Sequence, residues 1–139
     1  MNREYLEVWN SLMTLINGVR KEIENAILPT DISYLEFQIL QYIKFIGPST
    51  LATLSKELTI TRAGVTFTVE GLESRGLVKR KKVEEGRRVV FIALTPLGGR
   101  KLNVALKLQN DLIIRKMAQM SGAQLKSLNT LMLTLNALR

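Results

Sequence analysis

Residues 77–92, LVKRKKVEEGRRVVFI, combine strand-forming side chains with a dense group of cations around Gly86. Ammonium and guanidinium groups bind phosphate oxygens, so the segment is suited to a polyanion such as the backbone of DNA. Because side chains alternate between the two faces of a strand, we expect about three or four phosphate contacts at most. An ordinary exposed hairpin that uses lysine to protect its edge is the alternative. The six cations are Lys79, Arg80, Lys81, Lys82, Arg87 and Arg88.

The rest of the composition narrows the chemistry that the chain can perform. The 139 residues include 20 Lys and Arg against 12 Asp and Glu, and the net charge of +8 favours nucleic acid or an anionic membrane surface. Plain solubility charge is the alternative. The sequence has no Cys and no His, which excludes disulfides, thiol switching and the usual zinc ligand sets. It also has no nucleophile–base set and no phosphate-cradling glycine loop, so we expect no enzyme, no metal and no resident cofactor.

The sequence also indicates where the protein acts. The N-terminal segment MNREYLEVWNSLM carries acidic and polar residues within its apolar pattern, unlike a signal peptide. Its apolar runs are too short to cross a bilayer. We therefore expect a cytoplasmic protein without a membrane partner.

Apolar periodicity and breaker residues divide the chain into helices and one hairpin. Apolar spacings of three and four residues predict helices, and Pro29 interrupts the first of them. Thr50, Thr61 and Thr95 are placed to cap helix N-termini, and Gly76 is placed to end a helix in a left-handed conformation. The loop EEG joins two strands. The expected helices are 3–28, 33–46, 51–58, 61–75, 96–120 and 123–138, and the expected strands are 77–83 and 88–94.

Residues 51–77 contain two short helices that share one small core. Leucines line one side of the first helix, and Val65, Val69 and Leu72 line one side of the second. The tight turn between them and the basic hairpin after them predict a winged helix-turn-helix, whose second helix enters the major groove with its N-terminal turns. The alternative is that the outward residues only cap the helix, face solvent or pack on another helix. The residues expected to contact bases are Thr61, Arg62, Ala63, Thr66 and Phe67.

The stretch LATLSKELTITRAGVTFTVEGLESRGLVKRKKVEEGRRVVFIALTPLG resembles the MarR-type winged-helix transcriptional regulators. The resemblance covers about residues 33–100 in detail and the whole chain in helix order. It implies a mainly α fold with a small β-hairpin wing. Residues 33–95 would form the DNA-binding domain, and residues 1–32 and 96–139 would form a helical dimerisation region.

The resemblance also implies a homodimer held by the terminal helices, and the residues support this independently. The last helix carries apolar residues at heptad spacing, the first helix has a long apolar stripe, and a small winged domain cannot cover both. Packing of the two ends on each other within one chain is the alternative. A two-fold dimer would place two recognition helices one DNA turn apart, roughly 34 Å. The expected interface residues are Trp9, Leu12, Ile16, Leu125, Leu128, Met132 and Leu135.

Many family members bind small aromatic or anionic ligands between the dimer helices and the DNA-binding domain. The resemblance therefore implies a possible effector of unknown identity. Trp9, Tyr34 and Phe37 lie in helices that could line such a pocket. An aromatic residue at helical spacing is more often part of a core, which is the alternative.

The sequence departs from the family pattern at three positions. Gly86 stands where an aspartate two positions before a wing arginine commonly orders the wing. Phe67 occupies a position that is often polar or basic in the family, and Thr59 replaces a glycine that is common in the turn. These departures affect the expected base contacts and the order of the wing more than the expected fold.

The leading hypothesis is a dimeric regulator of transcription, acting as a repressor, that reads a pseudo-palindromic duplex with helix 61–75 in the major groove. Its wing, residues 77–94, would lie on phosphates or in the minor groove. The alternative is an architectural, chromatin-like protein that uses the same surface without reading bases. A further alternative, a monomeric module for membrane surfaces or protein partners, would use the apolar end helices.

Overall fold

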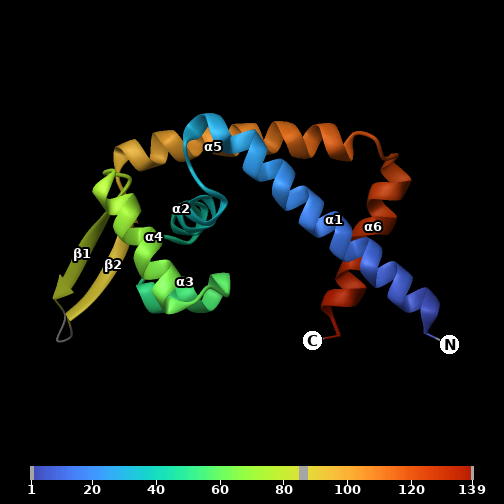
Figure 1. The fold of residues 1–139 in the computed structure, drawn as a ribbon, viewed down its shortest axis with the longest axis horizontal. Helices are drawn as coiled ribbons and strands as arrows, with labels where there is room; N and C mark the ends of the chain where they lie inside the picture. Colours follow the sequence, from blue (N-terminus) through green and yellow to red (C-terminus); the bar gives the residue numbers. More distant parts are fainter. Residues whose placement is uncertain (1, 85–87, 139) are drawn as a thin grey trace.

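The computed structural model describes residues 2–84 and 88–138, which form helices and a two-stranded antiparallel hairpin. The predicted mainly α fold with a β-hairpin wing is confirmed (Figure 1). The N-terminal helix is followed by a short 3-10 turn, η1 (Leu28–Thr30). The remaining elements are α1 (Arg3–Ile27), α2 (Tyr34–Ile46), α3 (Leu51–Leu58), α4 (Arg62–Ser74), β1 (Val78–Glu84), β2 (Arg88–Leu94), α5 (Pro96–Met117) and α6 (Gly122–Asn136).

Capping residues set where these helices begin. The side chains of Thr50, Thr61 and Thr95 each accept a hydrogen bond from the backbone N–H three residues further on. Ser33 and Ser121 form capping boxes in which the N3 side chain returns a bond to the N-cap backbone. Because a cap depends only on neighbours in the chain, the helix starts agree closely with the pattern in the sequence.

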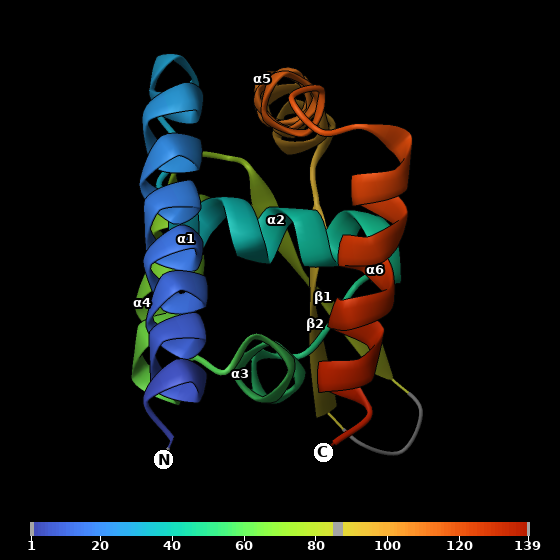
Figure 2. The ribbon, with the colours of Figure 1, turned by 90° about the vertical axis from the view of Figure 1, so that its right-hand side faces the viewer.

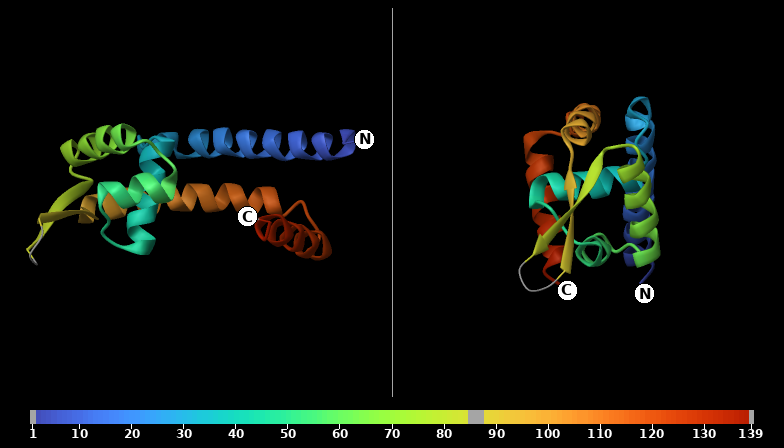
Figure 3. Two further views of the ribbon diagram at one scale, coloured as in Figure 1. Left: turned by 90° about the horizontal axis from the view of Figure 1, so that it is seen from below. Right: turned by 90° about the vertical axis from the view of Figure 1, so that its left-hand side faces the viewer.

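The elements form a compact head and an extended arm. In Figure 1, α2, α3, α4 and the hairpin lie together at one end of the molecule. The arm consists of α1, the distal part of α5, and α6; the N-terminus lies at its far end, and α6 turns back from the end of α5 (Figures 1 and 3). Contacts between α1 and α5 join the two long helices along the arm.

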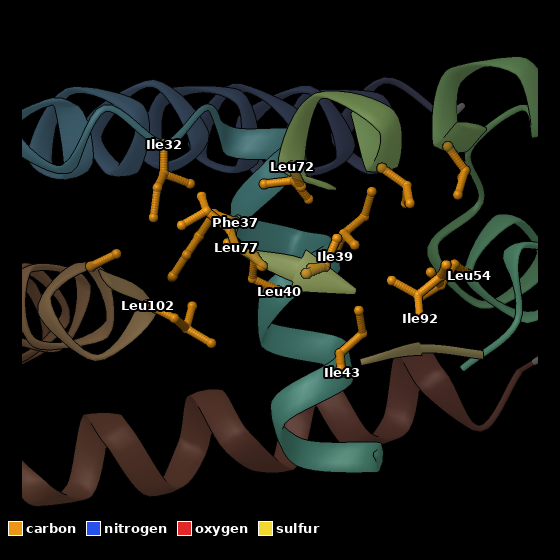
Figure 4. Close-up of a cluster of buried hydrophobic side chains, with 14 of the residues drawn as sticks. Ile32, Phe37, Ile39, Leu40, Ile43, Leu54, Leu72, Leu77, Ile92 and Leu102 are labelled. Carbon is orange, nitrogen blue, oxygen red and sulfur yellow. The ribbon is translucent and has the colours of Figure 1, made fainter. Parts of the chain in front are cut away.

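A continuous hydrophobic core holds the head together. Phe37, Leu40 and Ile43 of α2 belong to one cluster of buried side chains with Leu72 of α4 and Leu102 of α5 (Figure 4). Buried side chains from the end of α1 and the start of α5 belong to the same cluster. Both proposed domain boundaries, at residues 32/33 and 95/96, therefore lie within continuous packing rather than at a linker. The boundary-crossing core residues are Ile27, Ile32, Leu102 and Ala105.

The turn between α3 and α4 contains a strained residue, Thr59, which has a φ of 54°. A β-branched residue is disfavoured in this left-handed region, where glycine is readily accommodated. We expect Thr59→Gly to raise the free energy of unfolding by about 1 kcal/mol. Gly76 provides the reciprocal control, because it has a φ of 72° and space around it, so Gly76→Ala should lower stability by a similar amount. Urea unfolding measures both; a Thr59→Gly protein no more stable than wild type would contradict the argument.

Candidate nucleic-acid interface

The N-terminal turns of α4 carry exposed side chains on the face opposite the core. Val65 and Val69 are fully buried on the opposite face, where α4 packs on α2 and α3. The Thr61 hydroxyl caps the helix by accepting the Gly64 N–H at 3.1 Å, and this end of the helix dipole favours anions. Among the five residues predicted to contact bases, Thr61, Arg62, Ala63 and Phe67 are exposed and Thr66 is half-buried.

Phe67 is the most exposed large apolar side chain among those of the described residues, at 80%. Beside it lies an open surface hollow of about 430 Å³ between α4 and the start of α2. Gly71 lines this hollow and has no side chain to fill it. Within the described part of the chain, nothing lies within 4 Å of a Cβ built on Gly71. An aromatic ring this exposed within one chain is available for contact with a partner.

The hairpin lies beside α4 and presents cations along β1. Lys79, Arg80, Lys81 and Lys82 are all exposed, and they pair in register with Ala93, Ile92, Phe91 and Val90 of β2. Alternation places Lys79 and Lys81 on one face and Arg80 and Lys82 on the other. The backbone of Arg88 lies opposite that of Glu84 in the strand register, and Arg87 lies outside the described residues.

One of these wing cations already has a protein partner. Arg80 Nε lies 3.2 Å from Glu73 Oε2 near the C-terminus of α4, and both side chains are partly exposed. This ion pair joins the base of the wing to the helix beside it, in a chain that lacks the family's usual aspartate near Gly86. The pair makes Arg80 a poorer candidate for binding phosphate than its three lysine neighbours, because its charge is partly neutralised.

Comparison with known proteins identifies the fold of this head. Residues 30–89, which contain the helix pair and most of the hairpin, match the model of the MarR family. By this match, the head of the chain is a winged helix-turn-helix of the MarR family of transcriptional regulators. The chain is 28% identical over 78 residues to the HTH-type transcriptional regulator YwhA of Bacillus subtilis. That alignment covers 56% of each chain, so this protein spans about half the length of YwhA.

Solved structures share the arrangement over nearly the whole chain. The transcriptional regulator BldR from Sulfolobus solfataricus aligns with a TM-score of 0.77 at 27% identity, covering 95% of this chain and 98% of BldR. A MarR family protein from Bacillus stearothermophilus aligns with a TM-score of 0.87 at 19% identity, covering 99% and 96% of the two chains. The arm helices, and not only the head, therefore follow the same architecture.

The arm of the protein leaves apolar side chains uncovered. Trp9, Ile16 and Leu135 are 57%, 49% and 50% exposed, and Leu125 is 38% exposed. The expected alternative, in which the two ends of one chain cover each other, accounts for only part of the apolar surface. The other three predicted interface residues, Leu12, Leu128 and Met132, are half-buried and line a cavity between α1 and α6.

That cavity has a volume of about 590 Å³ and is lined by residues of α1, α2, α5 and α6. Figure 2 shows how these four helices are arranged. Among the three aromatic residues predicted to line an effector pocket, only Tyr34 contributes to it. Phe37 was wrongly placed there by the sequence reasoning: it is 1% exposed, because it lies on the core face of α2. Trp9 lies further out along α1 and does not line the cavity.

Arg20 and Met117 also line this cavity, and neither was predicted from the sequence to do so. The Arg20 guanidinium lies 4.9 Å from the centre of the Tyr34 ring, so a cation and an aromatic face occur together on an otherwise largely apolar wall. Met117 closes the cavity from α5. Their contribution depends on how α1 crosses α2 and α5, and sequence periodicity does not define that crossing.

Among the described residues, no group of three or more acidic side chains could hold a metal ion. A helix long and apolar enough to cross a membrane is likewise absent from residues 2–84 and 88–138.

Proposed function

We propose that this MarR-family protein is a homodimeric, sequence-specific DNA-binding repressor of transcription. In this proposal, the N-terminal turns of α4 read bases in the major groove, and the wing lysines contact phosphates or enter the minor groove. The observation that carries the proposal is the pairing of an exposed, capped helix N-terminus with a cationic hairpin on the same end of the molecule. Repression would follow from occupation of duplex that the transcription machinery needs.

Homodimerisation is part of the proposal, because one MarR-type head reads only half of a pseudo-palindromic site. The exposed apolar residues of α1 and α6 support a two-fold interface, since burying them in water-free contact is favourable. The interface residues proposed are Trp9, Leu12, Ile16, Leu125, Leu128, Met132 and Leu135. Such a dimer would place its recognition helices about 34 Å apart, on successive turns of duplex.

A small effector would occupy the cavity between the arm and α2. Arg20 and Tyr34 favour a small aromatic anion, whose ring would pack on Tyr34 and the apolar wall. Arg20 Nε lies 3.3 Å from Glu24 Oε1, so the guanidinium would bind the ligand carboxylate through its Nη groups, in competition with Glu24. Binding there would act on the junction between the arm and the head. This proposal replaces the predicted pocket of Trp9, Tyr34 and Phe37 with one in which Tyr34 is retained.

The alternative function is an architectural DNA-binding protein with little sequence preference. The observation that favours it is the exposed Phe67, because an aromatic residue can pack on DNA without reading a pattern of donors and acceptors. The two functions differ in their affinity ratio: a regulator should bind its selected site at least about 10³-fold more tightly than unrelated duplex at equal salt. Equal affinity for all duplexes would support the architectural function instead.

Two alanine variants test which surface reads sequence. Arg62→Ala should cost about 1–3 kcal/mol on the selected site and much less on unrelated duplex if Arg62 contacts a base. Lys81→Ala should weaken binding to every duplex alike and reduce the salt-dependence slope by about 0.9 if it contacts a phosphate. Fluorescence anisotropy at several salt concentrations measures both. If neither substitution changes affinity, the proposed contact surface is wrong.

A further inference from the structure

Arg75, the C-cap residue of α4, connects three parts of the structure through one guanidinium group. Its Nη1 donates to Glu36 Oε2 at 2.7 Å, in the first turn of α2. Its Nη2 donates to the backbone carbonyl of Asp31 at 2.6 Å. Asp31 follows η1 with a φ of 56°, at the point where the chain leaves α1 and turns toward α2. The end of α4 is thus bonded to the joint between the arm and the head.

The acceptor of this contact is itself fixed in place. Glu36 uses its other oxygen, Oε1, to accept the Ser33 N–H at 2.9 Å, which completes the capping box of α2. The Glu36 side chain is 15% exposed and that of Arg75 is 32% exposed, so solvent screens the pair less than a surface ion pair. Hydrogen bonds between two charged groups are strong and directional. By contrast, the apolar contacts of Val65 and Val69 are non-directional. The Arg75 bonds therefore add a directional constraint at the C-terminal end of α4 to the constraint from its core packing.

We propose that Arg75 is a positioning residue that sets the distance between the two recognition helices on DNA. The inference rests on the proposed dimeric DNA-binding function. The arm carries the proposed dimer interface, and the N-terminus of α4 carries the proposed base contacts, so Arg75 lies at the joint that relates one to the other. Because Arg75 is at the opposite end of α4 from the base contacts, it acts through the helix and does not contact bases itself.

Because of the length of α4, a small rotation at this joint would cause a large displacement of the helix end that is proposed to contact DNA. The 13-residue helix is about 20 Å long at 1.5 Å per residue. A rotation of about 10° about its C-terminal end would move its N-terminus by about 3 Å, close to the 3.4 Å rise of one base pair. Loss of the Arg75 contacts should therefore blur the preferred spacing between half-sites while leaving each half-site contact available.

The test uses duplexes derived from a site selected with the wild-type protein. One duplex keeps the two half-sites at the selected spacing, two others add or remove one base pair between them, and a fourth carries a single half-site. We expect wild type to lose about tenfold in affinity when the spacing changes by one base pair. For Arg75→Gln we expect that ratio to fall to about threefold or less, with half-site affinity within about twofold of wild type.

Glu36→Gln is the sharper second variant, because glutamine at N3 preserves the capping box while it removes the charge that Arg75 contacts. It should reproduce the loss of spacing preference with little change in the folding of α2, monitored by circular dichroism. Arg75→Lys keeps the charge, but an ammonium group does not present the planar fork that reaches both acceptors, so it should not restore the preference. Lys107→Gln is the control: it removes one positive charge from an exposed pair within α5 and should keep the wild-type spacing preference.

The outcomes separate this inference from the function on which it rests. Arg75→Gln and Glu36→Gln proteins that bind all four duplexes more weakly by one common factor, with the spacing ratio unchanged, would show a role in stability and overturn the inference alone. A wild-type protein that selects no sequence would overturn the proposed function itself.

Discussion

Gly98→Ala should lower the free energy of unfolding by about 3 kcal/mol or more. A Cβ at this position would lie 1.9 Å from the carbonyl oxygen of Leu77 and 2.8 Å from its carbonyl carbon. The obstructing atoms belong to the backbone, and that oxygen also accepts the Thr95 N–H at 3.1 Å, so it cannot move aside as a flexible side chain would. The first turn of α5 would have to separate from the base of β1. Urea unfolding followed by circular dichroism, at equal protein concentration, measures the loss.

The neighbouring glycine supplies the matched control. Within the described residues, nothing lies within 4 Å of a Cβ built on Gly99, and alanine is a better helix former than glycine by about 1 kcal/mol. Gly99→Ala should therefore leave stability unchanged or raise it by up to about that amount. The same methyl group, one residue apart, should thus have opposite effects. Similar losses from both substitutions would mean that the contact between α5 and Leu77 does not constrain the fold.

The features that depend on near neighbours in sequence could be predicted. Thr50, Thr61 and Thr95 cap the helices that they were expected to cap, since a cap needs only the next three residues. Gly76 adopts the left-handed conformation that ends α4. The exposed face of α4 also follows from periodicity, because burial of Val65 and Val69 determines which side chains face outward. The family resemblance added the order of the elements and the position of the wing.

Contacts between distant segments could not be predicted in the same way. Arg75 and Glu36 are 39 residues apart, and the sequence contains other carboxylates that could have paired with Arg75. The Arg80–Glu73 pair depends on the angle between the hairpin and α4, which no local pattern specifies. Each pair changes the function inferred for a cation. The pair with Glu36 makes Arg75 a positioning group, and the pair with Glu73 makes Arg80 less available for binding DNA.

The aromatic residues of α2 show a second reason for failure. One face of α2 lies in the core, and the face at the cavity mixes Tyr34 with the polar Gln38, so the second face is not clearly polar in the sequence. Tyr34 and Phe37 are close in sequence, yet Tyr34 lines the cavity and Phe37 is buried. Periodicity can separate an apolar face from a polar one, but it gives no clear signal for a face that mixes aromatic and polar side chains.

The other large expected effect is on assembly: Leu135→Glu should convert the proposed dimer into monomers. Leu135 is 50% exposed in the single chain, so glutamate costs the folded subunit little. In a two-fold interface, the same substitution buries two unpaired carboxylates, at a cost of several kcal/mol. A monomer binds one half-site and loses the avidity of the pair, so affinity for the complete site should fall about 100-fold or more. Sedimentation velocity and anisotropy titration measure the two effects.

Thr130→Glu is the matched control, because it adds the same charge to α6 about 140° around the helix from Leu135. Thr130 is exposed, and the proposed stripe of Leu125, Leu128, Met132 and Leu135 lies on another side. It should leave the protein dimeric and its affinity for the complete site near that of wild type. Affinity for a single half-site should be unchanged by Leu135→Glu, since α4 and the wing remain intact. A Leu135→Glu protein that stays dimeric would place the interface elsewhere on the arm, whereas one that becomes monomeric yet binds the complete site normally would show that dimerisation does not contribute to recognition.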